Sequence, residues 1–92
     1  MSEPIDIPQT DTIIVYSTVW GPDCKGAKRF FGEQRVPYLN VDIEKDSAAM
    51  AFVEKINHGM RSIPMIIFPD GSIMVEPSNA ELADKLGLQT KA

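Results

Sequence analysis

The chain has 92 residues, 43% of them hydrophobic, with 9 Lys and Arg against 13 Asp and Glu, for a formal net charge of −4 with His neutral. This length accommodates one domain of marginal stability. The single cysteine, Cys24, excludes an internal disulfide, and one histidine leaves no metal site of Cys and His alone within one chain, so no metal is expected. The negative balance argues against nucleic-acid binding, and no apolar run approaches the roughly 18–20 residues that span a bilayer.

Residues 1–11 (MSEPIDIPQTD) are acidic and interrupted by two prolines, unlike the basic and then apolar start of a signal peptide. We expect an extended leader over residues 1–11, one folded domain over 12–88 and a short tail over 89–92. These features favour a soluble cytoplasmic protein that acts as a monomer.

The first predicted elements are a strand, a helix and a second strand. Residues 12–17 (TIIVYS) are β-branched and aromatic, which is typical of a buried strand. A helix is expected to begin at Pro22, because the fixed φ and missing N–H of proline cost nothing in the first turn. The next strand is expected at residues 38–43 (YLNVDI). The inner face of the helix carries apolar residues at helical spacing: Cys24, Ala27, Phe30 and Phe31.

A second helix and a hairpin follow. Asp46 is placed to cap the helix, and Gly59 suits the left-handed conformation that ends it. A third strand (63–68) and a fourth (72–76) flank a Pro-Asp-Gly turn, which predicts a hairpin of antiparallel strands.

The last helix has both of its ends marked in the sequence. Ser78 and Glu81 form a capping box at its start, and Gly87 ends it. The resulting order is β-α-β-α-β-β-α. Because the first two strands are joined by a helix, they should be parallel, so we predict an α/β fold with one mixed four-stranded sheet and helices on both faces.

The segment Trp20 to Cys24 (WGPDC) lies where the first strand leads into the first helix. A cysteine at position 21 would complete a C-x-x-C motif there, and the free amides and positive dipole end of the helix would stabilise its thiolate. Because position 21 is glycine, the chain lacks the second sulfur that an internal dithiol cycle needs.

Two influences on the remaining thiol, Cys24, oppose each other. The helix end favours its thiolate, whereas a place on the inner face of the helix disfavours it. The plainer interpretation is a small buried cysteine that packs as a hydrophobic residue and does not react.

Two other segments have a structural and a functional interpretation. Ile63-Pro64 can simply start a strand, or a cis bond there can turn the backbone of Ile63 outward to pair with an extended peptide-like ligand. Ser78-Asn79 offers helix-start amides to a carboxylate, but the capping box explains the same residues, and we favour capping.

Together these stretches resemble the glutaredoxin family of the thioredoxin fold, in particular its short mycoredoxin-like members. The matching stretches run in order between Thr12 and Leu88. They are IIVYSTVW before the motif, PDCKGAKRFF after it, VPYLNVDIE on the second strand, RSIP where the family has TVP, and FPDGS at the hairpin.

The resemblance implies a thiol–disulfide oxidoreductase that acts on protein or low-molecular-weight-thiol mixed disulfides. It implies glutathione or mycothiol as the thiol co-substrate and no bound cofactor. Gly21 then holds the position of the missing attacking cysteine, and Cys24 holds the resolving position. The other implied site residues are Trp20, Pro22 and Asp23 as its lining, Ile63 and Pro64 as the ligand-pairing cis-proline segment, and Ser78 and Asn79 near the γ-glutamyl end of glutathione.

The chain departs from the family pattern in two ways. Monothiol relatives keep the first cysteine and lose the second, the reverse of this chain, and the same gap argues against a family-type [2Fe–2S] centre. Glu76-Pro77 stands where glutathione-using members often have Gly-Gly, which leaves mycothiol open as the thiol.

Gly21 has three explanations. The first is an engineered removal of the nucleophile from an active oxidoreductase. The second is a natural relative that kept the groove as a non-catalytic module binding a thiol or an extended peptide. In the third, Cys24 has become the nucleophile. The sequence leaves all three open.

Overall fold

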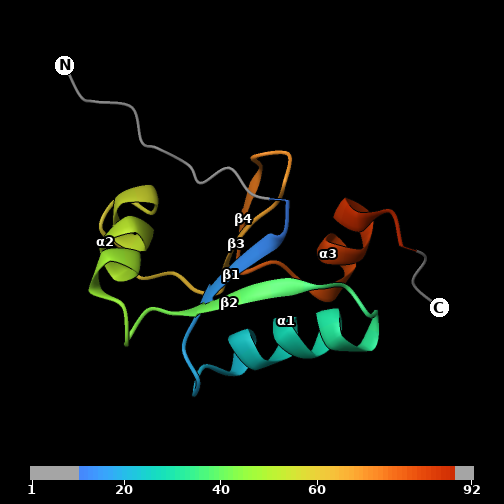
Figure 1. Ribbon diagram of the computed structural model, residues 1–92, viewed down its shortest axis with the longest axis horizontal. Coiled ribbons are helices and arrows are strands. Elements are labelled where there is room, and N and C mark those ends of the chain that lie inside the picture. The colour runs from blue at the N-terminus through green and yellow to red at the C-terminus, as the bar shows by residue number, and fades with distance from the viewer. Residues whose placement is uncertain (1–10, 89–92) are drawn as a thin grey trace.

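The computed structural model describes residues 11–88 (Figure 1). Nearly all of the expected leader and the whole of the expected tail lie outside these residues. The described elements follow the predicted order: β1 (Ile13–Ser17), α1 (Pro22–Glu33), β2 (Tyr38–Asp42), α2 (Ser47–Ile56), β3 (Met65–Ile67), β4 (Ile73–Val75) and α3 (Asn79–Leu86). Within this part of the chain no helix is long and apolar enough to cross a membrane.

The four strands form one mixed sheet in the order β2-β1-β3-β4. β1 and β2 are parallel, while β1 with β3 and β3 with β4 are antiparallel. Both pairings predicted from the sequence, the parallel crossover and the hairpin, are confirmed. Because Tyr16 pairs with Met65, the end of β1 lies beside the start of β3.

Successive residues of β1 face opposite layers of the molecule, as the period of a strand requires. Ile13 and Val15 pack with residues of α1 and α3, whereas Ile14 and Tyr16 pack with residues of α2. Figure 1 shows α2 on one side of the sheet and α1 with α3 on the other. Helices therefore cover both faces, as predicted.

The helix starts follow the capping residues that the sequence indicated. Pro22 opens α1, the Asp46 side chain accepts a hydrogen bond from the Ala49 N–H at 3.0 Å, and Ser78 forms its capping box with Glu81. Gly59 and Gly87 have positive φ angles of 92° and 70°. α2 already ends at Ile56, so Gly59 lies in the turn after the helix, and its amide still reaches back to the Glu54 carbonyl.

All four strands are shorter than predicted, β1 and β2 by one residue each and β3 and β4 by more. β3 begins at Met65 instead of residue 63, because Pro64 has no N–H to donate to a neighbouring strand. β4 ends at Val75, because Glu76 has a φ of 50°, which an extended strand does not accommodate.

Candidate functional site

In the loop between β1 and α1, the hydroxyl group of Thr18 accepts a hydrogen bond from the backbone at the start of the helix. Gly21 is the N-cap residue of α1 and offers no side chain to cap the helix. Instead, the Gly21 N–H donates to Oγ1 of Thr18 at 3.2 Å, and the Gly21 carbonyl accepts from the Lys25 N–H at 3.0 Å. Thr18 is 3% exposed, so this contact lies inside the protein.

Cys24 is the third residue of α1 and lies on its inner face. Its side chain is 1% exposed, and the thiol is free. Its burial agrees with the expectation of a core cysteine, because Ala27 and Phe31 on the same face are also buried. Its reactivity stays a prediction.

Gly21 faces the sulfur of Cys24. A Cβ atom at position 21 would lie 3.2 Å from Sγ of Cys24 and 3.6 Å from its Cβ. Cβ atoms of disulfide-bonded cysteines are about 3.5–4.5 Å apart, so the second sulfur of a C-x-x-C motif would lie within bonding range here. The same Cβ would lie 3.0 Å from Oγ1 of Thr18, which would have to shift by a few tenths of an ångström.

The start of α1 and the loop before β3 meet in one pocket of 250 Å³. Its lining includes Arg61 and Ile63 together with the whole segment from Trp20 to Cys24. The Ile63–Pro64 peptide bond is cis, and Pro64 is buried. The structure therefore brings the motif and Ile63 into one cleft, and the pairing of β1 with β3 explains why.

Ser78 and Asn79 lie in a second pocket, of 310 Å³, that shares Pro22 and Asp23 with the first. The Ser78 N–H donates to Oε1 of Glu81 at 2.9 Å, and the Glu81 N–H donates to Oγ of Ser78 at 3.1 Å. Hydrogen bonding from Ser78, first from its backbone and then from its side chain, lowers the pKa of the Glu81 carboxyl. The capping interpretation is thus satisfied geometrically, and part of the helix start is already occupied.

The exposed indole of Trp20 is hydrogen-bonded to the loop after β2. Its Nε1–H donates to Oε1 of Glu44 at 2.5 Å, which joins the motif to the loop after β2. A third pocket of 130 Å³ lies beside this contact and includes Thr18, Arg61 and Ile63. Arg61 is the one basic residue that lines either pocket around Trp20, and its Nε also pairs with Glu54 at 3.2 Å.

Sequence reasoning missed two residues of this site. Thr18 stands three residues before a helix N-cap, a spacing at which hydroxyl groups often bond to the backbone, so a signal was present. Glu44 is 24 positions from Trp20, and no local pattern links them. No group of three or more His, Cys, Asp or Glu suited to a metal ion occurs among residues 11–88.

Comparisons with known proteins agree with this geometry. The family model described as Glutaredoxin matches residues 13–73. A Mycobacterium tuberculosis protein assigned by name to the glutaredoxins is 38% identical over 77 residues, covering 84% of this chain and 92% of that protein. Mycoredoxin 1 of Corynebacterium glutamicum is 28% identical over 74 residues, covering 80% and 91%. A crystal structure of a mutant of the thioredoxin-like protein BC3987 superposes with a TM-score of 0.75 at 24% identity, covering 87% of this chain and 100% of that one. The expected thioredoxin fold is confirmed.

Proposed function

The chain belongs to the glutaredoxin family, and on that premise we propose that its cleft holds the substrates of a thiol–disulfide oxidoreductase. These are protein mixed disulfides or disulfides of a low-molecular-weight thiol such as glutathione or mycothiol. Gly21 occupies the place of the attacking cysteine, so this chain lacks the group that starts the usual reaction.

The proposal depends chiefly on the geometry at position 21. A Cβ there would lie 3.6 Å from the Cβ of Cys24, within the disulfide range, and Gly21 lines the 250 Å³ pocket that Ile63 also lines. A helix start with Pro22 in its first turn supplies the free amides that stabilise a thiolate at this place. The site contains one sulfur, and it would accept a second once Oγ1 of Thr18 shifts by a few tenths of an ångström.

The other residues take binding roles in this proposal. Trp20, Pro22 and Asp23 form the wall of the cleft, and the backbone of Ile63 before the cis bond pairs with an extended part of the ligand. Ser78 and Asn79, in the adjoining pocket, contact the far end of a thiol ligand. We place this action in the cytoplasm, where thiols are kept reduced, with the monomer as the acting species.

A second candidate function is a non-catalytic module that binds a thiol or an extended peptide. It is favoured by one observation: Cys24, the only cysteine of the chain, is 1% exposed. A site that binds in this way needs the cleft and Ile63 but no attacking group.

The experiment is to restore the missing sulfur. Gly21→Cys should form a Cys-x-x-Cys disulfide on mild oxidation and gain reductase activity on glutathione or mycothiol mixed disulfides, measured in separate arms, by several orders of magnitude over the unchanged chain. Gly32→Cys is the matched control. It adds a second thiol to the same helix at a position where a Cβ contacts nothing within 4 Å, and it should gain neither property.

The result also separates the two candidates. A folded Gly21→Cys variant that reduces neither substrate would overturn the oxidoreductase proposal. Saturable quenching of Trp20 fluorescence by a thiol or peptide would then support the binding module, since Trp20 is the only tryptophan and lines the cleft.

A further inference from the structure

The Trp20 indole lines both the 250 Å³ pocket beside Cys24 and the 130 Å³ pocket beside Glu44. We propose that Glu44 is a positioning residue, which fixes the orientation of this indole as the wall that the two pockets share. Glu44 thereby strengthens the binding of a ligand beside Cys24 without lining that pocket itself. The inference rests on the proposed function and deepens it.

The first support is the place of Trp20 between the two pockets. Trp20 directly precedes Gly21, the N-cap residue of α1, and its side chain is exposed. The two pockets also share Arg61 and Ile63, whereas Glu44 lines only the smaller one. Because the same indole lines both pockets, a change in its orientation changes the shape of both.

The second support is the way the indole is fixed. Trp20 is 65% exposed, and among residues 11–88 no aromatic ring or cationic group forms a ring contact with it. Its Nε1–H donates to Oε1 of Glu44 at 2.5 Å. A hydrogen bond to a carboxylate is shorter and stronger than one between neutral groups. This hydrogen bond is therefore the specific contact that selects one orientation of the ring.

The third support is that the backbone around Glu44 is itself fixed. The Glu44 N–H donates to Oδ1 of Asp42 at 2.9 Å. The preceding residue, Ile43, is 2% exposed, and its N–H donates to the carbonyl of Ser17 at 3.0 Å. Ser17 is the last residue of β1, three positions before Trp20. The loop that carries the acceptor is thus bonded to the strand that leads into the motif.

An oriented wall lowers the cost of binding. An exposed tryptophan side chain loses conformational freedom when a ligand packs against it, and this loss weakens binding. When Glu44 has already oriented the indole, a ligand that contacts Trp20 avoids part of that cost. Glu44 should therefore affect the affinity of the ligand and leave the chemical step beside Cys24 unchanged.

The first experiment observes the indole directly. Trp20 is the only tryptophan, so its Nε1–H gives one indole signal in a proton–nitrogen correlation spectrum. In Glu44→Leu, which removes the acceptor, this signal should shift and its heteronuclear NOE should fall. Glu44→Gln keeps an oxygen acceptor and should change both values less. Glu33→Leu is the matched control, because Glu33 is an exposed glutamate outside both pockets, and it should change neither.

The second experiment measures the consequence for the ligand. In the Gly21→Cys chain, KM and kcat are determined for the mixed disulfides of 2-hydroxyethanethiol with glutathione and with mycothiol. Adding Glu44→Leu should raise KM roughly three- to tenfold, the loss expected for one hydrogen bond, with kcat within about twofold. Adding Glu44→Gln should restore most of the affinity, and adding Glu33→Leu should have no effect. Thermal melting checks that each variant is folded, and Glu44→Ala replaces Glu44→Leu if that variant is not.

Two results would overturn the inference. One is an indole signal in folded Glu44→Leu that matches the signal in Glu33→Leu. The other is an active Gly21→Cys chain whose KM does not change when Glu44→Leu is added. An inactive Gly21→Cys chain instead removes the oxidoreductase proposal, and the indole signal then decides alone whether Glu44 positions Trp20.

Discussion

Replacing Phe31 by alanine should weaken the packing of α1, the helix that carries the candidate site, against the sheet and α3. Phe31 is fully buried in the cluster that joins α1 to the sheet and α3. Its ring centroid lies 5.4 Å from that of Tyr38 and 6.1 Å from that of Phe30. Cys24 lies on the same buried face of α1 as Phe31.

The size of the effect follows from the buried ring. A Phe→Ala change at a fully buried site costs about 3–5 kcal/mol of the free energy of unfolding, from lost burial and the cavity that remains. That is a large share of the roughly 5–15 kcal/mol available to a domain of this kind. At roughly 4–8 °C per kcal/mol for a domain of this size, Tm should fall by at least about 12 °C.

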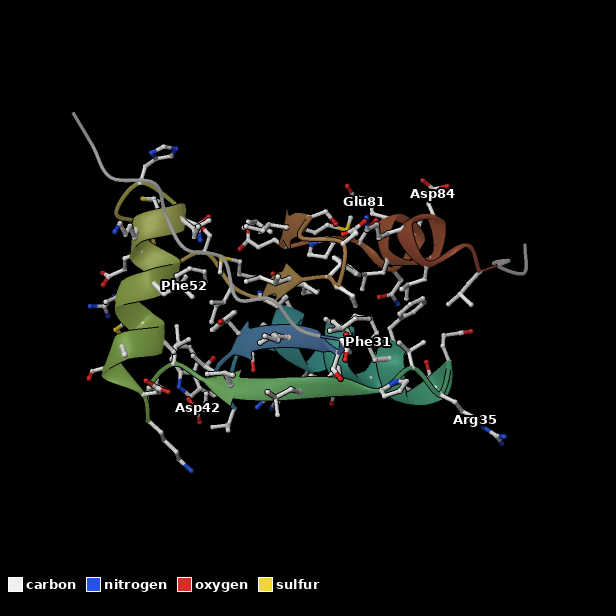
Figure 2. The ribbon with its side chains drawn as sticks, turned by 45° about the horizontal axis from the view of Figure 1, so that its top comes forward. Phe31, Arg35, Asp42, Phe52, Glu81 and Asp84 are labelled. Carbon is white, nitrogen blue, oxygen red and sulfur yellow. The ribbon has the colours of Figure 1, made fainter. Side chains whose placement is uncertain are left out.

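Urea unfolding followed by Trp20 fluorescence, with circular dichroism as a second probe, measures the loss. Phe52→Ala is the matched control. Phe52 lies on α2, on the opposite face of the sheet from Phe31 (Figure 2), and is only partly buried. Its ring centroid is 5.5 Å from that of Tyr16, so its loss should be clearly smaller. A Phe31→Ala loss below about 1 kcal/mol with an unchanged m-value would refute the reasoning, because it would mean that the cavity had closed or that the ring is not buried.

Three further changes test other parts of the fold. Ser78→Ala removes the cap of α3 and should cost about 1 kcal/mol in urea unfolding, whereas an unchanged midpoint would show that the capping box contributes nothing. Lys85 donates a hydrogen bond to Asp70 at 2.6 Å and, with Ser72, holds the pKa of Asp70 well below its usual range. The contribution of this pairing to the free energy of unfolding is therefore present at neutral pH and is lost as pH falls. The Tm difference between the unchanged chain and Asp70→Asn should therefore shrink on acidification, and a constant difference would contradict the pairing. Burial, followed by the charge of Asp46, raises the pKa of Tyr16 above 10.0, so the folded state keeps the neutral phenol and loses stability as pH rises past that value. Tyr16→Phe should therefore lose less stability at alkaline pH, measured by thermal unfolding followed by circular dichroism. If the variant and the unchanged chain lose the same stability at alkaline pH, this role of Tyr16 is excluded.

The fold was predictable because its signals are local. The β-branched run in β1, the spacing of Ala27 and Phe31 in α1 and the capping residues Asp46 and Ser78 each act within a few positions, and each element appears where they indicate it. The strand ends were less predictable. Glu76 ends β4 through a left-handed φ of 50° that glutamate rarely adopts, and nothing in its residue type signals this.

The candidate site was predictable only where a motif is continuous in sequence. The segment from Trp20 to Cys24 and the Ile63–Pro64 pair were both identified, and the pairing of β1 with β3 brings them together. The contact between Trp20 and Glu44 was not, because it depends on how two loops 24 positions apart meet. The burial of Cys24 followed from the helical spacing of the apolar residues, whereas the 3.2 Å between its sulfur and the Cβ position of residue 21 depends on the backbone of the loop.

Gly21 differs from the glycines that the backbone requires. Gly71 in the hairpin turn has a φ of 88°, in the region that side chains disfavour, so a larger residue there would be strained. Gly21, at φ −72° and ψ 125°, accepts other residues, and a substitution there changes the space beside Thr18 and Cys24 before it changes the backbone. Because an added Cβ would lie 3.0 Å from Oγ1 of Thr18, the stability of a Gly21 variant depends on how far that side chain can shift.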